Sequence, residues 1–300
     1  LFTHQYSVQG NAMRLAMNLL IKNEADIIED NIRFHAGQGV DCFVVMDNGS
    51  EDGTRDIVSQ LSQEFDIHLI ERPELDYQQS NWKTEMAKTS RNVLGADWSI
   101  ANDADEFWVA ADGNLKHDIS RWGSIVHCKR INMIPDESFH SAGFHYLDSP
   151  YRVNLPILNK GCNLVDNSNL SIMLGNINGK VMVNNHGLLR VKGGNHRAWH
   201  LWGQLNQKES ENTMVFHFPI RSKESFIRNV ENRARLLENG VHKMGDHYRR
   251  WVKLYRDNRL EEELERLTLS ANDAQTLTKF GVIMKDTSVG SHIRSQLGCH

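Results

Sequence analysis

The sequence predicts an α/β fold in which a mostly parallel, Rossmann-like sheet is flanked by helices. Two observations support this prediction. Short apolar runs suited to buried strands alternate with stretches of helical periodicity through the first third of the chain. Polar loops follow three of these runs. Because ligands bind beyond the carboxyl ends of parallel strands, these loops are where we expect the functional residues.

Buried strands are predicted where the chain is apolar and bounded by polar residues, at 14–21, 41–46, 67–70 and 98–101. Helices are expected between them, over about 23–38, 52–65 and 81–94. Acidic residues in its first turn favour the helix that opens near Asn23. Strands that alternate with helices in this way form a parallel sheet covered on both faces.

The middle of the chain predicts a mixed region of β-hairpins and loops. Asn, Gly and His are frequent there, and β-like runs are short, as at 180–183 and 188–191. Helical periodicity returns after Ser222, which is a suitable N-cap. A final helix is expected over about 246–267, so the C-terminal region is predicted to be helical.

Composition narrows the class of protein. The chain has 300 residues, a net charge of −4 and 40% hydrophobic residues, which is enough for a core and gives no sign of a nucleic-acid-binding surface. No apolar stretch approaches the roughly 18 residues of a transmembrane segment. Four scattered cysteines favour a reducing compartment. We therefore expect a cytoplasmic protein, with peripheral contact at the inner face of the membrane left open. Residues 1–12 are expected to be a disordered extension, native or added.

The most informative segment is Asn102-Asp103-Ala104-Asp105-Glu106, directly after an apolar strand. Two carboxylates at one edge of a sheet suit a hard divalent cation such as Mg²⁺ or Mn²⁺, which often arrives with a diphosphate. A solvated acidic turn is the alternative for any isolated Asp-x-Asp.

A second loop, 47–54, contains two glycines that permit positive φ and close approach of a ligand. Asp52 or Thr54 can cap the following helix, and Asp47 can accept hydrogen bonds from a base or ribose. A third loop, Lys22-Asn23-Glu24, follows the first strand. The three loops are expected at the same edge of the sheet.

As a set, these segments resemble family-2-type glycosyltransferases with the GT-A fold. The loop 47–54 is similar to their D-x-x-S-x-D-G-T segment, 88–95 to A-R-N-x-G, and 102–106 to D-x-D. The second half resembles a bacterial branch of these enzymes and, distantly, the family-92 enzymes. The resemblance implies a nucleotide-sugar donor, expected to be a UDP-sugar. It also implies Mn²⁺ or Mg²⁺ and an inverting transfer to a saccharide, lipid-linked or protein acceptor.

The same resemblance implies roles for individual residues. The nucleoside pocket would be lined by Asn23, Glu24 and Asp47, and Asn48 belongs to the same substrate-binding set. Ser50 would lie at its edge, and Arg91 would face the uracil and ribose. Asp103 would contact ribose and metal, Asp105 would bind the metal directly, and Lys180 and Arg221 are the candidate diphosphate contacts.

A third metal ligand and a catalytic base are less well defined. His196 is the first candidate for the ligand because glycines precede it, and His217 is the second. An inverting transfer needs a base, for which Asp166 is chosen on position alone. The alternative for Asp166 is a cap of the turn that follows it.

The resemblance divides the chain into a nucleotide-sugar-binding half (13–110), an acceptor-binding half (111–221) and a helical region (222–300). Two other functions remain open. One is a metal-dependent nucleotidyltransferase or phosphoesterase, and the other is a non-catalytic domain that binds a nucleotide sugar. The sequence makes no prediction of the oligomeric state.

Overall fold

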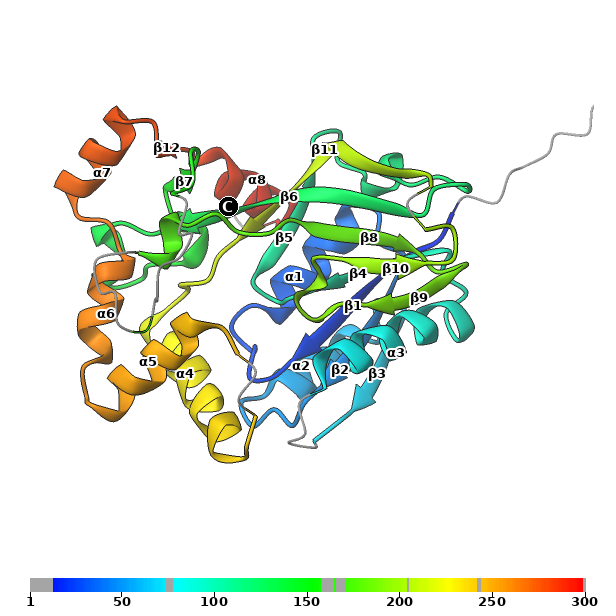
Figure 1. The fold of residues 1–300 in the computed structure, drawn as a ribbon, viewed down its shortest axis with the longest axis horizontal. Helices are drawn as coiled ribbons and strands as arrows, with labels where there is room; N and C mark the ends of the chain where they lie inside the picture. The colour runs from blue at the N-terminus through cyan, green and yellow to red at the C-terminus, as the bar shows by residue number, and fades with distance from the viewer. Residues whose placement is uncertain are drawn as a thin grey trace, which may run out of the picture.

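The computed structural model describes residues 13–73, 78–157, 165, 171–203, 205–241 and 244–298. Its first part alternates strands and helices as predicted (Figure 1): β1 (Leu15–Ile21), α1 (Ile28–Gly37), β2 (Cys42–Asp47), α2 (Thr54–Leu61), β3 (Ile67–Glu71), α3 (Gln79–Asn92) and β4 (Trp98–Asn102). The four strands are parallel to one another in the order β4-β1-β2-β3. The predicted α/β class is thus confirmed.

The middle of the chain extends this sheet. Its strands are β5 (Glu106–Ala110), β6 (Ile125–Ile134), β7 (Tyr151–Val153), β8 (Lys180–Asn184), β9 (Leu188–Val191), β10 (Ala198–His200) and β11 (Gln207–His217). Short 3-10 helices lie at Leu115–Asp118, Glu137–His140, Tyr146–Asp148, Ile172–Leu174 and Gly193–Asn195. β8 and β6 continue the sheet from β4 by antiparallel pairing, and β9 and β10 form a separate hairpin. This is the mixed β and loop region that the sequence predicts.

β11 is a long strand that pairs with two strands from earlier in the chain. It pairs antiparallel with β5 and parallel with β6, and it places His217 beside Glu106 on one side and Asn132 on the other. β11 therefore lies between these two strands in the sheet, and Figure 1 shows the three near one another. Residues distant in sequence therefore meet at the end of β11.

The C-terminal region is helical, as predicted, but divided differently. Its elements are α4 (Lys223–Glu238), α5 (Asp246–Arg256), α6 (Leu260–Leu267), α7 (Ala271–Lys279), the short strand β12 (Ile283–Lys285) and α8 (Ser288–Leu297). Ser222 caps α4 by accepting a hydrogen bond from the Ser225 N–H. The single helix expected over 246–267 is wrong, because the chain turns between α5 and α6, where Asn258 adopts a φ of 57°.

The helix expected from Asn23 also begins later, at Ile28. Asn23 has a φ of 58°, which no right-handed helix accepts. The backbone N–H groups of Asn23, Glu24 and Ala25 instead donate to side chains of the 47–54 loop. The first predicted site loop is therefore held by the second.

The core has two main parts. The larger packs one face of the parallel strands against α1, α2 and α8 and includes the fully buried Trp98, Phe107 and Trp108. The smaller lies among α4, α5, α6 and the end of β6, around Phe226 and Trp251. Val289 and Ile293 of α8 belong to the larger part, so the C-terminal helix packs back against the sheet domain. No helix of the described part of the chain is long and apolar enough to cross a bilayer.

His35 makes the stability of this core depend on pH. Its Nε2 accepts a hydrogen bond from the Trp108 N–H at 3.0 Å, and its Nδ1–H donates to the Asn31 carbonyl at 2.7 Å. Burial lowers the pKa of His35 from 6.5 to about 3, so the folded protein holds it neutral. The unfolded chain takes up this proton near pH 6.5. The stabilisation is therefore complete above pH 6.5 and is lost as the pH falls towards 3.

We expect the free energy of unfolding to fall by about 2 kcal/mol between pH 7.5 and pH 5 because of His35 alone. Urea titrations of the wild type and of His35→Gln at both pH values measure this effect. The variant should lose stability at pH 7.5, because its hydrogen bonds change, but it should lose about 2 kcal/mol less than the wild type on acidification. An equal loss in both proteins would show that His35 does not titrate on unfolding.

Candidate functional site

The three polar loops predicted to form the site meet at one edge of the sheet. Ile21 pairs with Asp47 on β2, and Leu19 pairs with Asn102 on β4, so the strands end side by side. Parallel strands in register deliver the residues that follow them to the same edge. The loops beginning at Lys22, Asp47 and Asp103 therefore surround one region.

The 47–54 loop is held by its own side chains. Asp47 is buried, and both its oxygens accept hydrogen bonds from the Ser50 N–H, at 3.2 and 3.1 Å. The Ser50 hydroxyl also donates to Asp47, and it accepts from the Asn23 N–H at 2.9 Å. Asp47 and Ser50 thus fix the loop, whereas Asn23, Glu24 and Asn48 line the cavity beside it.

The turn that carries the two aspartates is fixed by buried amides. The Asn31 side chain donates to the carbonyls of Ala104 and Glu106, at 2.8 and 3.0 Å. The Asn102 amide donates to the same Glu106 carbonyl at 3.1 Å, and its oxygen accepts from the Trp108 indole at 2.8 Å. These bonds satisfy the backbone of the turn where no water reaches it, so the directions of Asp103 and Asp105 are set in advance.

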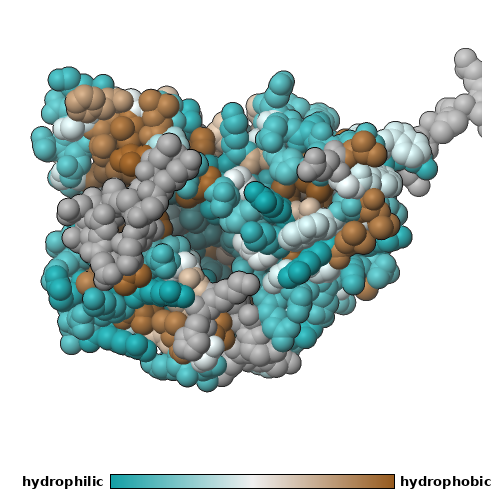
Figure 2. All heavy atoms as spheres, viewed as in Figure 1, coloured by the Kyte–Doolittle hydropathy of each residue, from teal (hydrophilic) through white to brown (hydrophobic). Residues whose placement is uncertain are grey.

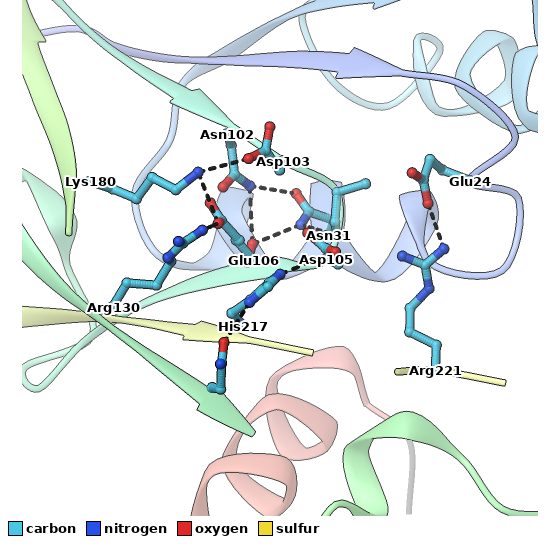
Figure 3. Close-up of polar contacts among 12 residues, drawn as sticks. Glu24, Asn31, Asn102, Asp103, Asp105, Glu106, Arg130, Lys180, His217 and Arg221 are labelled. Carbon is cyan, nitrogen blue, oxygen red and sulfur yellow. Dashed lines mark hydrogen bonds and ion pairs between the residues drawn. The ribbon is translucent and has the colours of Figure 1, made fainter. Parts of the chain in front are cut away.

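Asp103 lies against two buried lysines. Lys83 Nζ is 2.9 Å from one of its oxygens. Lys180 Nζ is 2.7 Å from the other, as Figure 3 shows. The Asp103 side chain is 34% exposed, while the lysine side chains are 1% and 0% exposed. Burial alone would raise the pKa of Asp103, but the two ammonium groups outweigh it and hold this pKa well below the usual range. Asp103 is therefore ionised, with its lysines behind it and a cavity in front.

Glu106 extends this network into the core. Its Oε1 contacts Lys180 Nζ at 2.9 Å and Arg130 Nη1 at 2.7 Å. Its Oε2 is buried and has no hydrogen-bond partner among the described residues. A buried carboxylate oxygen without a partner is costly, and such an atom marks a place where an unseen ligand can bind.

Asp105 faces His217, and the geometry fixes the tautomer of this histidine. The Asn132 amide donates to the Met173 carbonyl at 3.0 Å, so its oxygen must be the atom that lies 2.7 Å from His217 Nδ1. Nδ1 therefore carries a hydrogen. In neutral His217 the bare Nε2 then points at Asp105 Oδ2, 3.3 Å away.

Two lone pairs that face each other at this distance repel, so the contact requires either a proton on Nε2 or a cation bound to both groups. Burial acts to raise the pKa of Asp105, but attraction to His217 and Arg221 outweighs it, and the pKa lies below its usual value. Ligand atoms of Asp105, Glu106 and His217 all lie within 4.8 Å of one another. Two carboxylates and an imidazole held by an amide on its other nitrogen fit a divalent cation such as Mn²⁺ or Mg²⁺.

Asp105 and His217 face a cavity of about 490 Å³, which we call the reaction cavity. Asp103, Asp105, His196 and His217 line it, together with Trp251 of α5. The space-filling view shows the molecule hollowed between the sheet and the helical lobe (Figure 2). Asp105 and His217 are thus accessible to a substrate, whereas Glu106 is fully buried and does not line the cavity.

A neighbouring cavity of about 370 Å³, the nucleoside cavity, lies between the strand ends and α4. It shares Glu24, Asn229 and other wall residues with the reaction cavity. Arg221 lines the nucleoside cavity, with Nη2 2.6 Å from Glu24 Oε2 and Nε 2.9 Å from Asp26 Oδ2. Burial raises the pKa of Glu24 to about 7 although Arg221 opposes it. Glu24 therefore titrates near neutral pH.

The structure brings together most of the predicted site residues, but not all. Asp103, Asp105, His217, Lys180, Glu24 and Arg221 cluster as drawn in Figure 3. His196 lines the same reaction cavity, but it is not in the group of three close ligands, and its Nδ1 donates to the Gly179 carbonyl at 2.8 Å. Arg91 is exposed in the last turn of α3, and it lines none of these cavities. Asp166, the predicted base, lies outside the described residues.

Several site residues were not predicted: Asn31, Lys83, Glu106, Arg130 and Asn132. Glu106 directly follows the Asp-x-Asp segment and was available as a third carboxylate. Lys83 lies on α3 at an ordinary helical position, and nothing in the sequence distinguishes it from a surface lysine. Asn132 is recognised as a site residue only in the structure, where the pairing of β6 with β11 places it beside His217.

No family model matches this chain, and no curated protein matches it. Among solved structures, it is similar to a crystal structure of S. aureus TarS 1–349, with 10% identity and a TM-score of 0.41 over 85% of this chain and 71% of that chain. The same fragment in complex with UDP gives 12% identity and a TM-score of 0.42, also over 85% and 71%. The complex with UDP-GlcNAc gives 10% and 0.42, over 85% and 72%.

Proposed function

We propose that this protein is a glycosyltransferase that uses a divalent cation and a nucleotide sugar, with a UDP-sugar as the expected donor. One observation supports this most directly: Asp105 faces an imidazole of fixed tautomer at the carboxyl edge of a parallel sheet, beside a cavity large enough for a substrate. The resemblance of the three loops to family-2-type enzymes supports the same function.

The site separates the tasks that such a transfer requires. Asp105, Glu106 and His217 would hold Mn²⁺ or Mg²⁺, which supplies positive charge to neutralise a diphosphate leaving group. Asp103, kept ionised by Lys83 and Lys180, presents a carboxylate to the ribose side of the reaction cavity. These groups are fixed before substrate arrives, so little reorganisation is needed.

The donor would lie across both cavities. Asn23, Glu24 and Asn48 offer hydrogen-bonding groups to the nucleoside. Arg221 contacts Glu24, which lines both cavities, and would meet the diphosphate there. Arg221 is engaged by Glu24 and Asp26 in this structure. A diphosphate that replaces one of these carboxylates would keep the guanidinium paired.

An inverting transfer also needs a base for the acceptor hydroxyl, and Asp166 stays the proposed base. Saccharide, lipid-linked and protein acceptors all fit the proposal at this level. A phosphoesterase with two metal ions would need a second group of ligands, and the described part of the chain contains one such group.

Thermal-shift titrations test the donor proposal. UDP, GDP, dTDP and CDP are each added with Mn²⁺ and, separately, with EDTA. We expect UDP with Mn²⁺ at about 100 times its dissociation constant to raise the melting temperature by about 5 °C, because a ligand of the native state stabilises it. EDTA should remove most of the shift.

The outcomes separate the remaining possibilities. A shift with GDP or dTDP in place of UDP would mean that the donor carries that nucleotide, and the proposed binding site would stand. A UDP shift without release of UDP from any UDP-sugar, even to water, would identify a non-catalytic binding domain. No shift with any nucleotide would contradict the glycosyltransferase proposal.

A further inference from the structure

A third cavity, which we call the basic cleft, adjoins the reaction cavity on the side away from the nucleoside cavity. It has a volume of about 660 Å³ and lies among β6, the loop before β8 and the turn between β9 and β10. Its wall contains more cations than anions: Lys129, Arg130, Lys180, Lys192 and Arg197 against Glu209. Lys180 and His196, which belong to the predicted donor site, are part of its wall, whereas Lys129, Lys192 and Arg197 have no part in that site.

The cations of the cleft fall into two groups. Arg130 and Lys180 are neutralised by Glu106 and Asp103. Lys129, Lys192 and Arg197 are exposed and form no ion pair with another described residue. Even with Glu209 counted against them, the three exposed cations leave the wall of the cleft with a net positive charge, which would favour an anion placed there.

His196 also belongs to the wall of the cleft. Since Nδ1–H donates to the Gly179 carbonyl, the neutral ring has a bare Nε2. His196 lines both the basic cleft and the reaction cavity.

Three other residues share this wall between the cleft and the reaction cavity: Arg130, Asn132 and Ile177. The reaction cavity therefore has the nucleoside cavity on one side and the basic cleft on the other. A donor that fills the first two cavities leaves the cleft as the neighbouring space from which a second substrate can reach the sugar.

The structure assigns the basic cleft to the acceptor, and we infer that this acceptor carries phosphate or carboxylate groups near the hydroxyl that receives the sugar. This inference rests on the proposed function. In the transfer, the acceptor oxygen bonds to the anomeric carbon as the bond from that carbon to the diphosphate breaks. The bonding pair leaves with the nucleoside diphosphate, and the hydroxyl proton passes to the base.

The test uses three probes that share one ring: glucose, glucose 6-phosphate and glucuronate. Their binding to the full chain is measured by calorimetry with saturating UDP and Mn²⁺, so that the diphosphate site is already filled. Glucose 6-phosphate or glucuronate should bind at least about tenfold more tightly than glucose, and 300 mM NaCl should remove this preference. The two charged probes distinguish a phosphate acceptor from a carboxylate acceptor.

A charge-neutralised variant locates the effect. This variant combines Lys129→Gln, Lys192→Gln and Arg197→Gln. It should weaken binding of the charged probe about tenfold and leave the binding of glucose unchanged. The matched control combines Lys88→Gln, Lys253→Gln and Lys279→Gln, which remove three exposed charges away from the cleft. This control should bind the charged probe as the wild type does.

Failure of the inference and failure of the proposed function give different results. If the nucleotide shift is present but the charged probes bind no better than glucose, or bind the cleft variant as well as the wild type, the inference is wrong and the proposed function stands. If UDP with Mn²⁺ gives no shift, the proposed function fails, and the acceptor role of the cleft fails with it.

Discussion

Replacing Asp105 with asparagine is expected to lower the rate of nucleotide-sugar turnover about 10³-fold, because the cation loses a charged ligand and the leaving group loses its neutralising charge. The substitution keeps the size of the side chain, so the fold should be retained. Release of the nucleoside diphosphate, measured with Mn²⁺ present, gives the rate. His217→Gln should lower the rate in the same direction.

Two measurements make this prediction specific. The Mn²⁺-dependent part of the nucleotide thermal shift should disappear in Asp105→Asn, while any shift in EDTA stays. Asp56→Asn removes the same charge from an exposed position on α2 and should behave as the wild type. Full turnover by Asp105→Asn in the presence of metal would exclude Asp105 as a metal ligand.

Lys180→Met is expected to reduce the free energy of unfolding by about 3 kcal/mol, since it leaves buried carboxylates with too little positive charge. Lys180 contacts both Asp103 and Glu106, and its side chain is fully buried. Lys83 and Arg130 remain in place, which keeps the loss at the lower end of the range for a broken buried ion pair. Urea unfolding at pH 7.5 measures the change.

A surface ion pair provides the control. Lys223 pairs with Glu261, and both side chains are exposed. Lys223→Met should therefore cost less than about 1 kcal/mol. Adding Glu106→Gln to Lys180→Met should restore part of the lost stability, because it removes one of the uncompensated charges. Equal losses for Lys180→Met and Lys223→Met would mean that the buried network contributes little.

The parallel half of the sheet could be predicted because its signals are local. Each of β1 to β4 is a short apolar run followed by turn-forming residues, and each helix between them has a buried face. The site loops were predicted for the same reason. Asp47, Asp103 and Asp105 follow strands directly, so the direction of the strands places them together.

The remaining site residues depend on long-range pairing, which no local pattern encodes. His217 and Asn132 meet because β11 inserts beside β6, and β11 contains too many polar residues in its first half to be identified as a buried strand. Helix starts were misplaced for a similar reason. The chain at Asn23 has good helical propensity, but its N–H groups are taken by the 47–54 loop.

Buried charge was the hardest feature to predict. Lysine is usually a surface residue, so nothing in the sequence predicts that Lys83 and Lys180 are buried. The carboxylates that face them in the fold offset the cost of burying their charges. Arg91 illustrates the opposite case. It belongs to a segment similar to a known motif, yet α3 places it in its last turn, on the exposed surface.

The late position of β11 in the chain has a consequence for biosynthesis. Asp105 and Glu106 emerge from the ribosome long before His217, and β5 has no partner strand until β11 is made. Domains form from the N-terminus during translation, and contacts between distant segments form slowly. The group of Asp105, Glu106 and His217 is thus completed only after β6 to β10 have been synthesised. Under the proposed function, a nascent chain would therefore be unable to hold a cation at this site before the wall of the basic cleft has been made.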